Sequence, residues 1–262
     1  MVLAGLSASP GRVTAQQPEA KAAPAEIDPK AIEALKSMGS QLRALKAFAL
    51  RSETTIDEIL DNGQKVQFGG TVDYRVRRPN GLRLEIVSDR RHRQYYFNGK
   101  TLTQYGPTMK YYASVAAPPT LAELVQVLDQ KCGLEMPLSD LFLWGTDKDG
   151  INDIKSASYI GPSRIAGAAC DHYAFRQQDV DWQIWIERGK TTLPRKLVIT
   201  TTSEPAQPQY VALLKWDLAP KLDDRTFTFV PPKDAHKIEM TSASAAAGKN
   251  KLEACHEETD YA

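Results

Sequence analysis

The chain has 262 residues, with 33 Lys and Arg against 32 Asp and Glu, which leaves a formal net charge of +1. A nucleic-acid partner is not predicted, because such binders usually carry a basic excess. The hydrophobic content of 42% is typical of a globular protein rather than of a disordered chain, and the absence of an apolar run of 18 residues predicts no transmembrane segment.

The two ends of the chain do not resemble folded protein. Residues 1–28 are rich in Ala, Ser, Pro and Gln, and a small-x-small pattern at 13–15 fits the remnant of a signal peptide, although the basic n-region is missing. A flexible leader of another kind is the alternative. Residues 241–262 are predicted to be a disordered tail. One domain is therefore expected over residues 29–240.

The first predicted element is a helix that begins at Pro29, with Asp28 as its N-cap. Gly39 is expected to weaken the middle of this helix. After Phe48 the hydrophobic period changes to two, which indicates strands. The segments 65–68 and 71–77 are expected to be separate strands.

A helical insertion interrupts the strands. Thr120 is the expected N-cap of one helix, and a second short helix is predicted over 138–144. Strands resume at Ser156 and end with a predicted strand over 227–230. About eleven strands without strand-helix-strand alternation predict a mainly β (α+β) fold with one curved antiparallel sheet, an open half-barrel.

Alternation along the strands predicts one strongly apolar sheet face. The three predicted helices are the only candidates to cover that face, which a monomer does not leave exposed. The covered space is either a packed core or a cavity under a movable lid, and the pattern alone favours the core. The residues expected on the sheet face are Trp182, Ile184, Ile186, Leu214 and Trp216, and those on the covering helix are Leu121, Leu124 and Leu128.

No catalytic motif is found, and neither an enzyme, a metal nor a cofactor is predicted. His172 is the one candidate general base, but a single histidine without a nucleophile motif is more often structural. The acidic segment 147–153 resembles half of a calcium loop and lacks its final Glu, which favours a solvated turn. Cys132 and Cys170 could form a disulfide in an oxidising compartment or remain two thiols.

Three segments resemble the LolA-type lipoprotein carriers: residues 74–85, 97–105 and 227–235. A closer resemblance, carried by residues 170–176, 181–186 and 193–199, is to a family of predicted periplasmic proteins of unknown function within that superfamily.

The resemblance implies an eleven-strand half-barrel with helices at its mouth and a location in the periplasm. The LolA-type carriers bind acyl chains in this cavity, and an arginine in their R-P-N turn governs the lid. Arg78 occupies that position here. The alternative is that Arg78 only begins a turn and pairs with a surface carboxylate.

Together these observations predict a monomeric periplasmic protein that holds an acyl chain, a lipid or a lipidated protein in an apolar cavity under a helical lid. The predicted lining consists of the eight residues named above, with Arg78 controlling the lid. An envelope sensor or adaptor that binds a protein partner is the alternative, and an enzyme that uses His172 is a third and weaker hypothesis.

Overall fold

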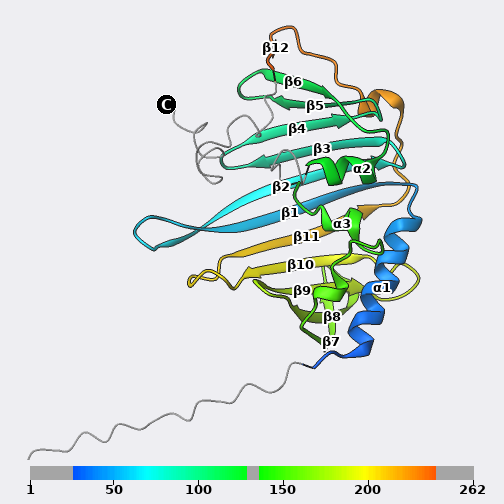
Figure 1. The fold of residues 1–262 in the computed structure, drawn as a ribbon, viewed down its shortest axis with the longest axis vertical. Coiled ribbons are helices and arrows are strands. Elements are labelled where there is room, and N and C mark those ends of the chain that lie inside the picture. Colours follow the sequence, from blue (N-terminus) through cyan, green and yellow to red (C-terminus); the bar gives the residue numbers. More distant parts are fainter. Residues whose placement is uncertain (1–25, 129–135, 240–262) are drawn as a thin grey trace, which may run out of the picture.

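The computed structural model describes residues 26–128 and 136–239, which form one twelve-stranded sheet that is not closed into a barrel (Figure 1). The strand order is β12-β6-β5-β4-β3-β2-β1-β11-β10-β9-β8-β7. All neighbours are antiparallel except β12, which pairs in parallel with β6. The strands are β1 Ala47–Ile59, β2 Lys65–Arg77, β3 Gly81–Ser88, β4 His92–Phe97, β5 Thr101–Gly106, β6 Tyr111–Ala116, β7 Ser156–Ile165, β8 Ala168–Arg176, β9 Val180–Glu187, β10 Pro194–Thr201, β11 Gln209–Asp217 and β12 His236–Lys237.

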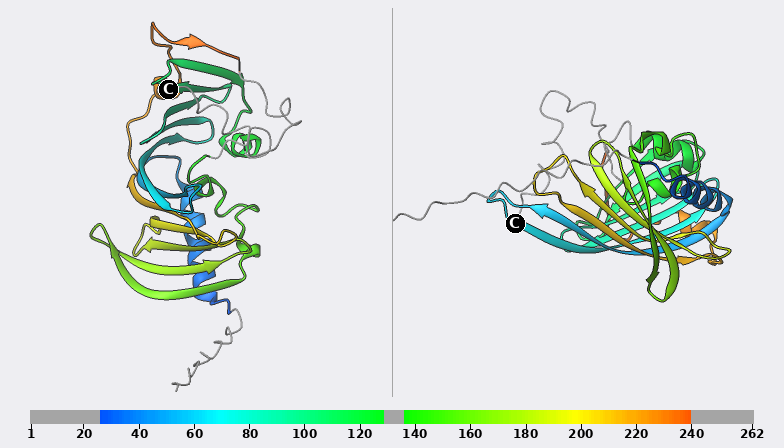
Figure 2. Two further views of the ribbon diagram at one scale, coloured as in Figure 1. Left: turned by 90° about the vertical axis from the view of Figure 1, so that its left-hand side faces the viewer. Right: turned by 90° about the horizontal axis from the view of Figure 1, so that it is seen from below.

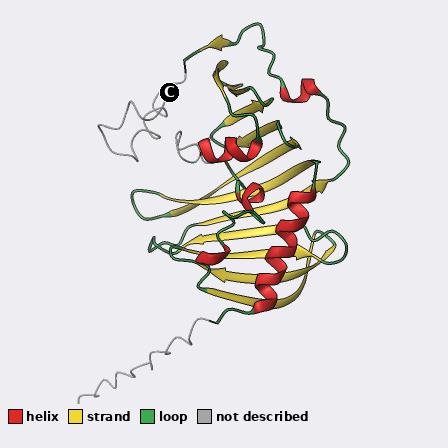
Figure 3. Cartoon of the chain, turned by 45° about the vertical axis from the view of Figure 1, so that its right-hand side comes forward, coloured by secondary structure: helices red, strands yellow, loops and turns green. Residues whose placement is uncertain are grey.

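The sheet is strongly curved, and the helices lie on its concave side (Figure 2). The helices are α1 Pro29–Ala44, α2 Leu121–Val127 and α3 Asp140–Leu143, with short 3-10 turns η2 Ile151–Asp153 and η3 Asp224–Phe227. The helix α1 crosses the strands from β7 toward β1 (Figure 3). The predicted fold class, an open curved sheet with helices on its concave face, is confirmed.

Both predicted helix caps are present. Asp28 accepts a hydrogen bond from the Lys30 backbone N–H at 2.8 Å, and Thr120 accepts one from the Glu123 N–H at 3.3 Å. The helix predicted over 138–144 is shorter than expected, since only α3 is helical. None of the helices in the two described ranges is long and apolar enough to cross a membrane.

The segments 65–68 and 71–77 were predicted as two strands and are one strand, β2. Pairing with β1 continues without interruption through Gly69 and Gly70. A Cβ on Gly70 would lie 2.8 Å from the Val87 carbonyl oxygen. Glycine at this position therefore allows β3 to approach β2 closely and does not end the strand.

The strand predicted over 227–230 is wrong. Phe227 ends the 3-10 turn η3, and Phe229 packs on the convex face of the sheet among three tyrosine rings, with centroid separations of 5.1–5.3 Å. A period of two places both phenylalanines on one side of the segment, as in a strand. Here that side packs onto the face of the sheet, and the backbone forms no ladder with an edge strand.

The predicted domain, residues 29–240, begins and ends close to the first and last residues that the structure describes. The predicted leader falls outside them up to residue 25, while Ile27 already forms a parallel bridge with Ala157 of β7. The predicted tail, 241–262, lies wholly outside them.

An ion-pair cluster joins β8 to the loop after β9, close to the start of α1. Asp171 accepts hydrogen bonds from the Arg188 guanidinium and, at 2.8 Å, from the Tyr159 hydroxyl. These bonds, from Arg188 first, hold the pKa of Asp171 below its usual range. Lys30 of α1 lies 3.5 Å over the Tyr159 ring, so the cluster also borders the first turn of the helix.

Replacing Asp171 by Asn should lower the free energy of unfolding at pH 7 by up to about 1 kcal/mol. Because the folded-state pKa is lowered, the stabilisation is fully present above the unfolded-state pKa of about 3.9 and is lost as the pH falls through the folded-state value. Urea unfolding of both proteins between pH 7 and pH 2 should therefore give curves that converge at the acidic end. A constant difference over the whole range would contradict this assignment.

Candidate ligand-binding site

The eight predicted lining residues meet on the concave face. All belong to, or pack against, one hydrophobic cluster between the sheet and the helices. Seven are buried, and Trp216 is partly exposed. The predicted face assignments of β9 and β11 therefore agree with the structure. The seven buried residues are Leu121, Leu124, Leu128, Trp182, Ile184, Ile186 and Leu214.

The segment that carries α2 and α3 acts as a cover and is attached to the sheet through two backbone carbonyls. The Leu121 N–H at the start of α2 donates to the Pro79 carbonyl at 2.8 Å, and the Tyr74 hydroxyl donates to the Pro137 carbonyl. Phe142 of α3 lies 5.7 Å from the Tyr74 ring, between ring centroids. Buried apolar side chains of the two helices, such as Leu124 and Phe142, hold this cover on the sheet together with those two hydrogen bonds.

Arg78 lies near the cover. Its guanidinium lies 5.9 Å from the centroid of the Phe142 ring. Its Nε is buried without a hydrogen-bond partner among the described residues, and burial lowers the pKa of this arginine. None of the ion pairs within residues 26–128 and 136–239 involves Arg78. Its control of lid opening stays a prediction.

The helices cover only one end of the concave face. In Figure 1 they lie over one end of the strands, and the β1–β2 hairpin extends away from them at the other end. Toward that hairpin the concave face carries incompletely covered apolar side chains, with Ile56 46% exposed, together with polar ones such as Ser52 and Arg93. The partly exposed group comprises Phe68, Ile86, Tyr95, Val180, Ile199 and Tyr210. An apolar surface therefore continues from the core to the open end of the half-barrel.

Asp140, the first residue of α3, marks the edge of the covered space. It is exposed, and yet surrounding protein desolvates its carboxyl and raises its pKa. Tyr74 lies close enough to Asp140, Tyr95 and Tyr210 for their charges to raise its pKa further, after the larger effect of burial.

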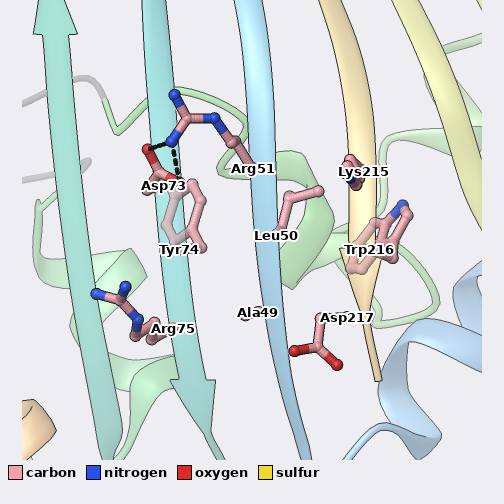
Figure 4. Close-up of a pocket in the computed structure, with 9 residues that line it drawn as sticks. All are labelled: Ala49, Leu50, Arg51, Asp73, Tyr74, Arg75, Lys215, Trp216 and Asp217. Carbon is pink, nitrogen blue, oxygen red and sulfur yellow. Dashed lines mark hydrogen bonds and ion pairs between the residues drawn. The ribbon is translucent and has the colours of Figure 1, made fainter. Parts of the chain in front are cut away.

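A depression on the convex face is a second candidate (Figure 4). It lies over Ala49 and is bordered by Arg75 and Lys215 and by the Arg51–Asp73 pair, whose atoms are 3.1 Å apart. Its volume of about 200 Å³ is below the roughly 300–1,000 Å³ of typical small-molecule sites. This depression is therefore not the predicted acyl-chain site.

His172 and Cys170 lie on the convex side of the sheet, opposite to the concave cluster. The His172 ring stacks 4.0 Å from Trp185, its Nε2 lies 3.0 Å from Gln183 Oε1, and burial lowers its pKa. These are contacts of a structural histidine. Cys170 is buried beside Trp185. Cys132 lies outside the described residues, so both alternatives for Cys132 and Cys170, a disulfide or two thiols, stay predictions.

The acidic segment 147–153 forms a turn in which Asp149 accepts a hydrogen bond from the Ile151 N–H at 3.2 Å. No group of three or more side chains suited to hold a metal is found in the part of the chain that the structure describes.

Sequence reasoning missed how the cover is attached to the sheet and to α1. A Cβ on Gly39 would lie 2.6 Å from the Gly145 nitrogen, so α1 and the turn after α3 touch through two glycines. Gly145 also has a φ of 76°, a value that favours glycine. The only signal of this contact in the sequence is Gly39 itself, a residue that is unfavourable within a helix.

Replacing Tyr74 by Phe should loosen the cover. The change leaves the Pro137 carbonyl without its donor and should lower the free energy of unfolding by about 1–2 kcal/mol. Amide hydrogen exchange should accelerate in residues 138–144, while exchange in α1 changes little. Faster exchange throughout the sheet, without a larger effect at 138–144, would show that this hydrogen bond does not hold the cover.

Residues 31–241 match a family described as "Predicted periplasmic protein (DUF2092)". The chain belongs to this family. The narrower resemblance drawn from the sequence is thereby confirmed, and so is the predicted location in the periplasm. None of the curated proteins compared with the chain matches it.

Several solved structures are similar over most of the chain. The lipoprotein LppX of Mycobacterium tuberculosis is 11% identical, with 75% of this chain and 100% of that chain covered and a TM-score of 0.47. LprF of Mycobacterium bovis is 12% identical, with 80% and 99% covered and a TM-score of 0.38. A LolA superfamily protein of Nitrosomonas europaea is 12% identical, with 76% and 97% covered and a TM-score of 0.32. Such TM-scores mark similarities too distant to say what this chain binds.

Proposed function

We propose that this protein is a periplasmic binding or carrier protein that holds the acyl chain of a lipid or lipidated protein against the concave face of its sheet. The observation that carries the proposal is the apolar surface that runs from under α2 and α3 to the open end of the half-barrel. The resemblance of residues 74–85 and 97–105 to LolA-type carriers supports it.

The energetics favour such a ligand. Each CH₂ group of a chain that enters an apolar site contributes roughly 0.8 kcal/mol. The cover is held by buried apolar side chains as well as by hydrogen bonds such as the one from Leu121 to Pro79, so the methylene groups of the ligand must replace that burial when the cover moves. Release requires only that the open state be favoured, which is a shift of population without covalent chemistry.

The test is to purify the protein from the envelope of a Gram-negative host and to identify copurifying molecules by native mass spectrometry and lipid extraction. Acyl-chain species are expected with the wild-type protein. Their amount should fall in Leu124→Asn, which places a polar group among the buried side chains of α2. Leu213→Asn is the matched control, because Leu213 is 42% exposed on the convex face.

Two results would count against the proposal. One is the absence of any acyl species from the wild-type protein, together with no uptake of an added fluorescent fatty acid. The other is equal loss of the acyl species in the two variants while circular dichroism shows both to be folded.

The alternative function, an envelope sensor or adaptor, requires a protein partner on a surface. The convex depression favours it, since Arg75 and Lys215 form no ion pair within the described residues and flank an apolar floor at Ala49. A copurifying protein that is lost in the double variant Arg75→Glu and Lys215→Glu, with no acyl species present, would support this alternative.

A further inference from the structure

A row of concave side chains crosses four strands at the boundary between the covered and open ends of the sheet. Trp182 of β9 pairs with Ile199 of β10, Ile199 with Tyr210 of β11, and Tyr210 with Ile56 of β1. Adjacent strands are about 4.8 Å apart, so the backbones of Trp182 and Tyr210 are separated by roughly 10 Å. Both side chains lie on the concave face, because the register pairs each of them with Ile199, and that face is strongly curved (Figure 2).

Two polar atoms in this row are buried without a hydrogen-bond partner. They are the indole Nε1 of Trp182 and the hydroxyl oxygen of Tyr210, judged against all residues that the structure describes. Trp182 is only 9% exposed and stacks 4.2 Å from the ring of Phe175. By contrast, the indole of Trp216 on the same face donates to the Pro194 carbonyl at 2.8 Å. Buried donors almost always have a partner, so two in one row require an explanation.

The chemistry of the two groups defines what would satisfy them. The indole N–H is a donor only, and the hydroxyl of Tyr210 remains protonated because burial raises its pKa. The indole therefore requires an acceptor, and an acceptor would also satisfy the O–H of Tyr210. None of the four residues in the row is a cation, so a carboxylate at this row would have no charged partner among them. An uncharged carbonyl oxygen fits both the donors and the apolar surroundings.

We propose that Tyr210 and Trp182 donate hydrogen bonds to carbonyl groups of the bound molecule, so that the site takes ester- or amide-linked acyl chains in preference to hydrocarbons or free fatty acids. This inference rests on the proposed function and specifies its ligand. The same carbonyl chemistry occurs in a glycerolipid and in the acylated end of a lipidated protein.

Isothermal titration calorimetry with the full chain tests the inference. The probes are dihexanoyl phosphatidylcholine and its di-O-hexyl ether analogue, which share head group and chain length and differ in the two carbonyls. Both are used below the concentration at which they form micelles. The wild-type protein should bind the ester about fivefold more tightly than the ether, the factor expected for hydrogen bonds gained in a buried site.

Tyr210→Phe and Trp182→Phe should each bring the ratio of ester to ether affinity to about two or less. Because the ratio compares two ligands of the same variant, a change in packing affects both affinities alike and drops out. Tyr210→Phe removes a single oxygen atom. Trp185→Phe, the same substitution on the convex face of β9, should keep the wild-type ratio. A diacylglyceryl-cysteine peptide and its dialkyl analogue form a second arm. An ester preference that Tyr210→Phe removes supports the inference in either arm. The ester that binds more tightly, the phospholipid or the lipidated peptide, shows which of them is the source of the bound acyl chain.

The outcomes separate the two proposals. If the wild-type protein binds ester and ether equally, or if both phenylalanine variants keep the ester preference, the inference is overturned and the proposed function stands. If the wild-type protein binds no probe in either arm, both are overturned.

Discussion

Gly39→Ala should destabilise the protein by about 1–3 kcal/mol and separate α1 from the cover, although the same substitution inside a free helix stabilises by up to about 1 kcal/mol. The added methyl group would lie 2.6 Å from the nitrogen and 2.8 Å from the Cα of Gly145. Those atoms are backbone and cannot rotate away. The turn after α3 must therefore move, and the displacement should be measurable as a lower midpoint of denaturant unfolding.

Ser40→Ala is the matched control for this change. Ser40 is the next residue of α1 and is exposed, so the alanine should be neutral or slightly stabilising. Hydrogen exchange should accelerate at residues 140–146 in Gly39→Ala and remain unchanged in Ser40→Ala. Equal stability of the two variants would mean that the two glycine backbones are not in contact in solution.

Phe227→Ala should lower the free energy of unfolding by about 3–5 kcal/mol, the larger of the two effects. The Phe227 side chain is 2% exposed, and the Arg77 guanidinium lies 4.8 Å from its ring centroid. A Cβ on Gly81 would lie 3.0 Å from the ring, so the neighbouring turn is shaped around it. Truncation leaves a space that the turn cannot fill, and unfolding in urea measures the loss.

Val230→Ala provides the control, because Val230 lies in the same segment and is 79% exposed. Its substitution should change stability by less than about 0.5 kcal/mol. If the two variants were equally stable, residues 227–230 would contribute no packing. The pair thus tests whether this segment is held by its aromatic side chain, as described here, or by backbone pairing.

Much of the architecture could be predicted from local patterns. The caps at Asp28 and Thr120 depend on neighbouring backbone donors, and strand faces depend on a period of two, which is a property of each strand alone. For this reason Trp182 and Leu214 could be placed on one face without knowledge of the fold. The family resemblance also needed only short segments, and the match over residues 31–241 confirmed it.

The errors arose where two distant segments meet. Local pattern cannot distinguish a strand at 227–230 from a segment whose phenylalanines pack on the face of a sheet. In both structures alternate side chains are buried and the ones between them are exposed. Nor can it show that Gly39 faces Gly145, over a hundred residues away.

The sequence by itself therefore determined an apolar concave face and a helical cover, since amphipathic periodicity is local and forces burial. Only the tertiary structure decided how the cover is held and where the apolar face remains open. It also revealed that Trp182 and Tyr210 have no hydrogen-bond partner for their buried polar atoms among residues 26–128 and 136–239, because hydrogen-bond satisfaction depends on which side chains converge across strands.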